Sequence, residues 1–197
     1  MDLYEQVTEI FHSHIDTSMR SMEELPGNIA EAGQLLTHCL LSDKKILCCG
    51  EDQSGSLAQI FSSHLLHRFN YERPGLAAIC LSTNPTLITA ITKEGNFSEI
   101  FAKQIRALGQ AGDILLVLAN DSNTPSASQA IQTAHDRDMI VISVNGSNNQ
   151  SSALLFPEDI EISIPTNNRS RIIEAQLLII NCLCELIDFQ LFGGEAE

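Results

Sequence analysis

Five short apolar segments, separated by stretches long enough to form helices, constrain the fold of this 197-residue chain more than any other feature. They are rich in Ile, Leu and Val, hardly alternate with polar residues, and occupy Ile46–Cys49, Ala77–Leu81, Ile114–Leu118, Ile140–Val144 and Ile160–Ile164. Strands without alternation are typical of a parallel sheet that is covered by helices on both faces. The pattern therefore predicts an α/β fold, a three-layer α-β-α sandwich with a parallel five-stranded sheet.

Helical periodicity precedes and follows these segments. Residues 1–41 carry apolar side chains at spacings of three, four and seven, and Pro26-Gly27 interrupts them, which predicts an N-terminal helical hairpin. The α/β core and a C-terminal helix are expected over residues 42–192. No linker or internal repeat divides the chain, so residues 1–197 are interpreted as a single domain.

The C-terminal helix is unusual because it is apolar over most of its circumference. Its polar residues Glu174, Asn181, Glu185 and Asp188 fall on one narrow stripe. A helix of this kind is buried on several sides. Since its acidic residues argue against a membrane span, a place between subunits is expected, and the chain is predicted to form a homo-oligomer.

Charge and cysteine content indicate which binding partners and which cellular compartment fit this protein. Eleven Lys and Arg against 25 Asp and Glu give a formal net charge of −14, which disfavours direct binding of nucleic acid and of anionic membranes. The chain starts without the basic and apolar regions of a secretory signal. Its six cysteines are therefore interpreted as reduced packing residues of a cytoplasmic protein.

Two polar loops follow predicted strands and lead into helices. One is Gly50–Ser56 and the other is Ala119–Thr124. Ligands of open α/β sheets bind beyond the carboxyl ends of the strands, where helix N-termini can receive an anion. The first loop superficially resembles a nucleotide-binding loop, but Ser56 replaces the essential lysine, which excludes a nucleoside triphosphatase.

An ordered set of motifs covers the chain from about residue 5 to Phe192. It comprises Lys45–Gly50, Arg68-Phe69 with Glu72–Pro74, Ala102–Gly109, Ala111–Leu116, Arg137–Met139 and Asn181–Asp188. With this set the chain resembles the SIS (sugar isomerase) domain and, within it, the phosphoheptose isomerase group. It is most similar to that group's DiaA-like paralogues, which associate with the replication initiator DnaA. The resemblance implies an SIS fold and a homotetramer built as a dimer of dimers.

The resemblance implies one of two activities. Phosphoheptose isomerases convert sedoheptulose 7-phosphate with a glutamate and a histidine near a zinc ion, whereas DiaA-like proteins promote assembly of DnaA at the origin. The isomerase metal and acid–base positions fall here at Ile60, His64, Ile173 and Asn181. This set predicts no catalytic residue, no metal and no cofactor. We therefore expect a non-catalytic, DiaA-like scaffold; the alternative is a phosphoheptose isomerase or a sugar-phosphate-binding sensor.

The loops support the same interpretation. Glu51, Asp52 and Asp121 introduce carboxylates where a phosphate would bind, and two like charges about 4 Å apart cost about 4 kcal/mol at an effective dielectric of 20. Repulsion is expected unless these side chains turn outward. The remaining candidates for a small polar ligand, a sugar phosphate among them, are Ser54, Asn123, Thr124 and Glu94, although loop capping is the alternative role of the first three.

Two further pairs of residues are candidates for a functional role. Leu191-Phe192 stands where the resemblance places a contact of DiaA-like proteins with DnaA; the alternative is that both side chains complete the packing of their own helix. His64 and His67, three residues apart on a helix, could share a metal ion. Zinc requires three or four ligands, however, and no third one is evident nearby.

Overall fold

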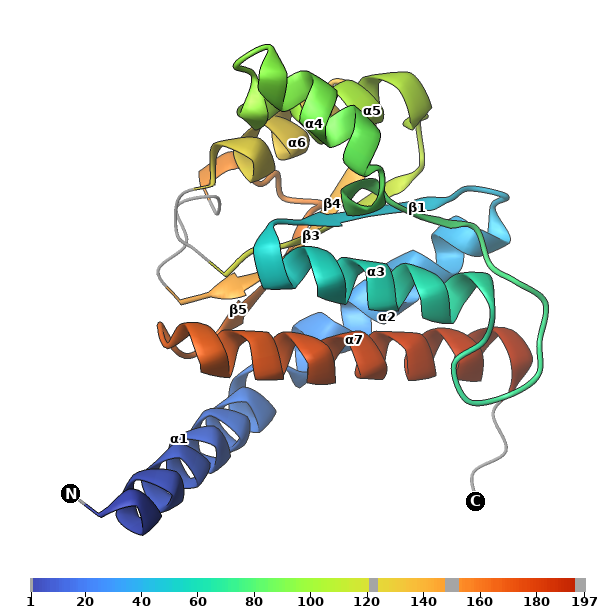
Figure 1. Ribbon diagram of the computed structural model, residues 1–197. Helices are drawn as coiled ribbons and strands as arrows, with labels where there is room; N and C mark the ends of the chain where they lie inside the picture. Colours follow the sequence, from blue (N-terminus) through green and yellow to red (C-terminus); the bar gives the residue numbers. More distant parts are fainter. Residues whose placement is uncertain (1, 121–123, 148–152, 194–197) are drawn as a thin grey trace.

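The computed structural model describes residues 2–120, 124–147 and 153–193 and contains a parallel five-stranded sheet in the order β2-β1-β3-β4-β5 (Figure 1). The strands are β1 (Ile46–Gly50), β2 (Ala78–Cys80), β3 (Ile114–Leu118), β4 (Ile140–Gly146) and β5 (Ile160–Ile164). The predicted sheet is confirmed, with strand bounds that differ from the apolar segments by at most two residues.

Helices cover both faces of the sheet, as expected for three layers. On one face lie α2 (Pro26–Leu41), α3 (Asp52–Leu66) and α7 (Arg169–Phe192); on the other lie α4 (Pro85–Lys93), α5 (Ala102–Leu108) and α6 (Pro125–His135) (Figure 1). Two 3₁₀ turns, Leu81–Thr83 and Phe97–Glu99, flank α4. The first helix, α1 (Leu3–Glu24), precedes this sandwich.

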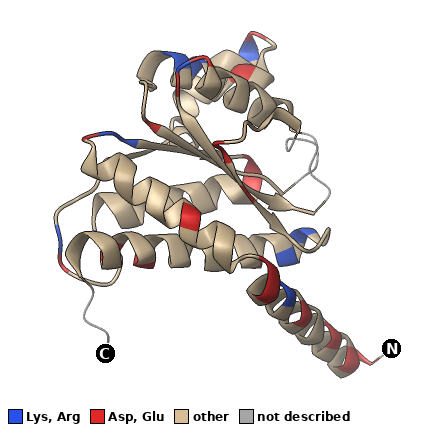
Figure 2. Ribbon diagram, turned by 180° about the vertical axis from the view of Figure 1, so that it is seen from behind, with Lys and Arg blue, Asp and Glu red and all other residues tan. Residues whose placement is uncertain are grey.

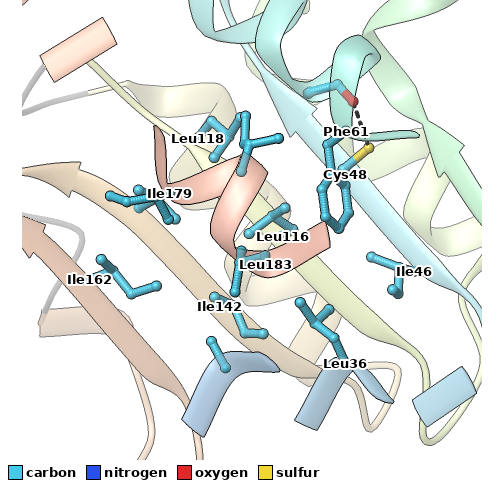
Figure 3. Packing of buried hydrophobic residues seen from close by; sticks show 14 of the residues in the cluster. Leu36, Ile46, Cys48, Phe61, Leu116, Leu118, Ile142, Ile162, Ile179 and Leu183 are labelled. Carbon is cyan, nitrogen blue, oxygen red and sulfur yellow. Dashed lines mark hydrogen bonds between the residues drawn. The ribbon is translucent and has the colours of Figure 1, made fainter. Parts of the chain in front are cut away.

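Each strand residue of β1 is buried, because successive side chains enter opposite layers. Ile46 and Cys48 join the cluster beneath α2, α3 and α7 together with Phe61, whereas Leu47 and Cys49 join the cluster on the other face (Figure 3). Burial on both sides removes the need for polar residues at alternate positions. This explains why the strand segments do not alternate in the sequence.

The N-terminal pair of helices is splayed rather than closed along its length. α1 projects from the body as an arm, and acidic residues recur along it (Figures 1 and 2). Only Thr17 of α1 is buried, while Leu3, Tyr4 and Phe11 are 76%, 77% and 63% exposed. A single chain therefore leaves the apolar face of α1 largely uncovered.

α7 packs against α2 and α3 beneath the sheet. The polar stripe of α7 does not face solvent along its whole length, because Asp188 is buried and ion-paired. Leu178 and Phe189, in contrast, are more than half exposed. Among the described residues, none of the helices combines the length and apolar character that crossing a membrane requires.

Candidate functional site

The two predicted loops meet at one edge of the sheet, where the strand order reverses. After β1 the chain moves to β2 on one side, whereas β3 lies on the other side, and Gly50 pairs with Leu118 in register. Such a switch point is the usual ligand site of an open α/β sheet. A small pocket lies here, lined by residues of both loops that include Glu51, Asn120 and Thr124. Its volume of about 10 Å³ holds about one water.

The first loop is pressed against the end of β1. A Cβ atom on Gly50 would lie 2.6 Å from the carbonyl carbon of Ser54, so this position requires glycine. Asp52 adopts a positive φ of 51°, a conformation that Asp tolerates better than most residues. The turn brings the first turn of α3 directly over the strand end.

Ser54 is completely buried at this edge and belongs to a polar network. Its Oγ donates to Oε1 of Gln176 over 3.0 Å. The Gln176 amide nitrogen in turn donates to the carbonyl oxygens of Ala119, at 2.9 Å, and Val144, at 3.1 Å. The network ties α3 and α7 to the ends of β3 and β4. It stabilises the edge and occupies the only proton that the Ser54 hydroxyl can donate.

The carboxylates of the first loop are both engaged. Glu51 accepts a hydrogen bond from the buried hydroxyl of Ser126, and Asp52 forms an ion pair with Arg169 at the start of α7. The third carboxylate, that of Asp121, lies outside the described residues. The Asp52 charge is thus balanced by a cation, whereas Glu51 lies at the pocket wall, hydrogen-bonded to a neutral hydroxyl.

Two features on the β3 side of the pocket favour an anion. The Nδ2 atom of Asn120 is buried and has no hydrogen-bond partner among the residues that the structure describes. α6 begins beside it, with Thr124 as the N-cap residue and Pro125 in the first position. The first backbone N–H groups of a helix and an unpaired amide are both donors, and the helix dipole adds a partial positive charge. The arrangement suits a small anionic group.

The other residues predicted for a ligand loop do not gather here. Asn123 lies outside the described residues. Glu94 ends α4, is exposed, and forms an ion pair of 3.1 Å with Lys103; it does not line the pocket. Of the described candidates, Thr124 lines the pocket, whereas Ser54 is buried at the same edge of the sheet and does not line it. The role of all four in ligand binding stays a prediction.

The residues at the isomerase metal positions do not fit a zinc ion. Ile60 and Ile173 offer no donor atom, and His64 packs edge-on against Phe69 with ring centroids 4.9 Å apart. His67 is the exposed C-cap of α3. Within the described parts of the chain, no three His, Cys, Asp or Glu side chains are grouped closely enough to hold a metal. No step through a zinc ion is therefore derived for this chain.

Leu191 and Phe192 lie at the far end of α7. Phe192 is sixteen residues beyond Gln176, roughly 24 Å along the helix axis, and is 46% exposed. Its ring centroid lies 5.9 Å from the guanidinium carbon of Arg73. Leu191 is half-buried against the core. The pair is thus remote from the pocket and partly used in packing.

Sequence reasoning missed the polar residues that organise the edge. Gln176 is the clearest case: it is an uncharged polar residue outside the polar stripe of α7, which is a signal for a buried hydrogen-bonding role. Asn120 and Ser126 stand within or just after a loop that was singled out, but nothing local distinguished them from their neighbours. Arg169 carries no local signal of a role here, because its partner Asp52 lies 117 residues away in the sequence.

Comparison with known proteins identifies the family. The sequence model of the SIS domain matches residues 10–146. The chain is 45% identical to a phosphoheptose isomerase of Chromohalobacter salexigens over 98% of this chain and 99% of that protein, and 45% identical to one of Methylococcus capsulatus over 98% and 100%. The structure of a phosphoheptose isomerase from Francisella tularensis matches with a TM-score of 0.92 at 38% identity, covering 95% of this chain and 99% of that one.

These relatives contradict the interpretation as a non-catalytic, DiaA-like scaffold that binds DnaA. The motifs behind that interpretation include the strand ends, turns and helix contacts that the fold itself requires, so they do not separate two groups that share the fold. The substituted positions on α3 and α7 do not outweigh similarity along the whole chain. The SIS fold expected from the motifs is confirmed, and the chain belongs to the SIS domain family and, within it, to the phosphoheptose isomerase group.

Proposed function

We propose that this protein binds and isomerises a sugar phosphate of the class used by phosphoheptose isomerases. The observation that carries the proposal is the 45% identity to such an enzyme over 98% of the chain. Similarity of fold alone would not support a substrate class. Sedoheptulose 7-phosphate, the substrate implied by the resemblance, is therefore the first compound to test.

The phosphate end of the ligand is assigned to the pocket between β1 and β3. The N-terminus of α6 and the unpaired Asn120 amide supply donors for its oxygens. A phosphate is larger than the space for one water, so binding requires the Glu51 side chain to leave Ser126. This movement removes a carboxylate from the pocket and frees the Ser126 hydroxyl as a further donor.

Binding tests this assignment directly. Calorimetric titration with inorganic phosphate and with sedoheptulose 7-phosphate should show binding that Glu51→Gln tightens, because the substitution keeps the size of the side chain and removes its charge. The repulsion of about 4 kcal/mol at 4 Å is an upper limit, and we expect at least about a tenfold gain, which is about 1.4 kcal/mol. Glu72→Gln, on an exposed carboxylate that pairs with Arg68 beyond α3, is the matched control. Equal affinities of the Glu51 variant and wild type would contradict the assignment.

Isomerisation also requires a group that moves a proton between adjacent carbons. His64 stands where the resemblance places the isomerase glutamate, and histidine is the side chain most often used for proton transfer. It lies ten residues beyond Ser54 on α3, about 15 Å along the helix axis. A sugar phosphate held at the pocket must therefore extend along α3 for its reacting carbons to approach His64.

Turnover separates the two parts of the proposal. Conversion of sedoheptulose 7-phosphate should occur with and without added zinc, should fall at least about 100-fold in His64→Ala, and should persist in His67→Ala, the exposed neighbour. If wild type binds the sugar phosphate without converting it, the isomerase part is wrong and the binding part stands. If it neither binds nor converts it, both parts are wrong.

A homotetramer is proposed as the working assembly, as the resemblance implies. An apolar groove of about 450 Å³ runs between the α1–α2 junction and α7, and Met22, Leu25, Ile29, Leu178, Ile179 and Leu186 are among the residues that line it. Together with the uncovered face of α1, it leaves a large apolar surface for a second copy. Light scattering after gel filtration should give four chains for wild type and fewer for Leu178→Glu, whereas His12→Glu on the polar side of α1 should leave the mass unchanged. A wild-type monomer would contradict the proposal.

A further inference from the structure

Two cysteines face one another across the edge of the sheet. Cys48 of β1 and Cys80 of β2 are register partners in the parallel ladder, and both side chains enter the cluster beneath α3. Neighbouring strands lie about 4.8 Å apart, within the Cα separation that a disulfide can span. The Cys48 thiol donates to the carbonyl oxygens of Ala58, over 3.2 Å, and Ile79, over 3.6 Å, and it lies close enough to Cys80 for each thiol to shift the pKa of the other. The register thus places the two side chains next to each other, and closing the bond requires only a local shift of the end of β2.

The two thiols differ in access and in ionisation. Cys80 ends the edge strand and is 7% exposed, whereas Cys48 is completely buried. The neighbouring Cys48 thiol, and the backbone and hydroxyl of Ser82, lower the pKa of Cys80 from 9.0 to about 7 against the opposing effect of burial. The neighbouring Cys80 thiol and burial raise the pKa of Cys48. Of the two thiols, Cys80 is therefore the one that loses its proton more readily.

We propose that Cys80 and Cys48 form a peroxide-sensitive thiol pair, in which Cys80 is oxidised first and Cys48 closes a disulfide. The Cys80 thiolate attacks one oxygen of hydrogen peroxide, so that the O–O bond breaks, hydroxide leaves, and a sulfenic acid remains. The Cys48 sulfur then attacks the Cys80 sulfur; the S–S bond forms, the S–O bond breaks, and water leaves with the Cys48 proton. The sum consumes one peroxide and two thiols and gives one disulfide and two waters.

Oxidation of this thiol pair would change contacts at the end of β1, beside the pocket. The Ser82 hydroxyl donates to the Gly50 carbonyl over 2.8 Å and accepts from the Gly50 N–H over 3.3 Å. These bonds connect Ser82, in the 3₁₀ turn Leu81–Thr83, to the end of β1. A disulfide draws the two Cβ atoms to about 3.8 Å, which moves the end of β2 and its Ser82 contact relative to Gly50. Formation of the disulfide itself does not depend on the proposed function of the pocket.

Peptide mapping after treatment with hydrogen peroxide tests the pair in the folded, full-length protein. A tryptic digest without reductant places Cys48 and Cys49 in residues 46–68 and Cys80 in residues 69–93. We expect these two peptides to be joined, with the loss of two hydrogen atoms, and separated again by a reductant. Cys49→Ser should keep the link, because Cys49 points to the opposite face of the sheet. Cys48→Ser should abolish the link and leave a sulfenic acid on Cys80 that a dimedone probe labels.

Alkylation of the reduced protein gives an independent readout. At pH 7 a thiol with a pKa of about 7 is half ionised. Cys182 is the most exposed of the remaining cysteines, and burial raises its pKa above 9.0, so about 1% of it or less is ionised. Iodoacetamide should therefore modify Cys80 at least on the order of tenfold faster than Cys182, after allowance for the lower nucleophilicity of the Cys80 thiolate. Cys182→Ser, whose folding is checked by circular dichroism, should leave the 48–80 link unchanged. A peroxide-treated wild type whose peptides 46–68 and 69–93 stay separate, or whose link survives Cys48→Ser, would overturn the proposal.

Discussion

Replacing Arg73 tests how the C-terminal end of α3 is attached to α7. Nε of Arg73 donates to Oδ1 of Asp188 over 2.6 Å, and the two side chains are 2% and 4% exposed. The guanidinium also donates to the carbonyl oxygens of His64, Leu65 and Pro74 at 2.9, 2.9 and 3.1 Å. Two of these carbonyls belong to the last turn of α3, where no helical donor remains for them.

Arg73→Met should destabilise the fold by about 3–5 kcal/mol, the usual cost of leaving one charge of a buried pair without its partner. Within the described parts of the chain, the second oxygen of Asp188 is already buried without a hydrogen-bond partner, so no neighbouring donor is in place to compensate for the loss of Arg73. Asp188→Leu should cost less, about 2–3 kcal/mol, since the guanidinium keeps its three carbonyl acceptors. The double variant should be clearly less destabilised than the sum of the two, because it removes both charges together.

Urea denaturation at a fixed protein concentration measures these differences, with the concentration fixed because assembly contributes to apparent stability. Arg68→Met is the matched control: Arg68 pairs with the exposed Glu72 four residues away, and its loss should cost about 0.5 kcal/mol or less. A cost below about 1 kcal/mol for Arg73→Met, or additive effects in the double variant, would refute the assignment of a coupled buried pair.

Three further predictions concern the edge of the sheet and the buried thiols. Gln176→Leu leaves the buried Ser54 hydroxyl and the Ala119 carbonyl without this partner, whereas the Val144 carbonyl keeps its bond from the Ala119 N–H. It should lower the free energy of unfolding by about 2–4 kcal/mol in urea; an effect below about 1 kcal/mol would contradict the network. Gly50→Ala places a Cβ 2.6 Å from backbone and should cost about 1–3 kcal/mol, whereas Gly27→Ala, with no atom within 4 Å, should be neutral or stabilising. Burial raises the pKa of Cys39 to about 11 and that of Cys184 to about 12 from 9.0. Above pH 9 the unfolded chain therefore loses these protons before the folded protein does. The contribution of the buried thiols to the free energy of unfolding should be fully present below pH 9 and should fall as pH rises towards 11, by up to about 3 kcal/mol for Cys39. A denaturation series in which Cys39→Ala leaves that slope unchanged would contradict the assignment.

The amino-acid sequence by itself determined the layers and the location of the site. Apolar runs such as Ile114–Leu118 report burial on both faces of a strand, and this information is local, so the sheet and its helices could be predicted. The loops after β1 and β3 could be placed at one edge, because parallel strands share the direction of their carboxyl ends. The family could also be recognised from the sequence, but the motifs that identify the fold did not decide between isomerase and scaffold.

Only the tertiary structure decided which polar residues meet. Ser54 bonds to Gln176 across 122 positions, and Arg73 meets Asp188 across 115. Asp188 could be assigned to the polar stripe of α7 because periodicity gives the face of a helix on which a residue lies, but not the element that packs against that face. A buried polar group must find a partner, yet which partner it finds depends on how distant segments pack, and the sequence pattern of one segment does not contain that information.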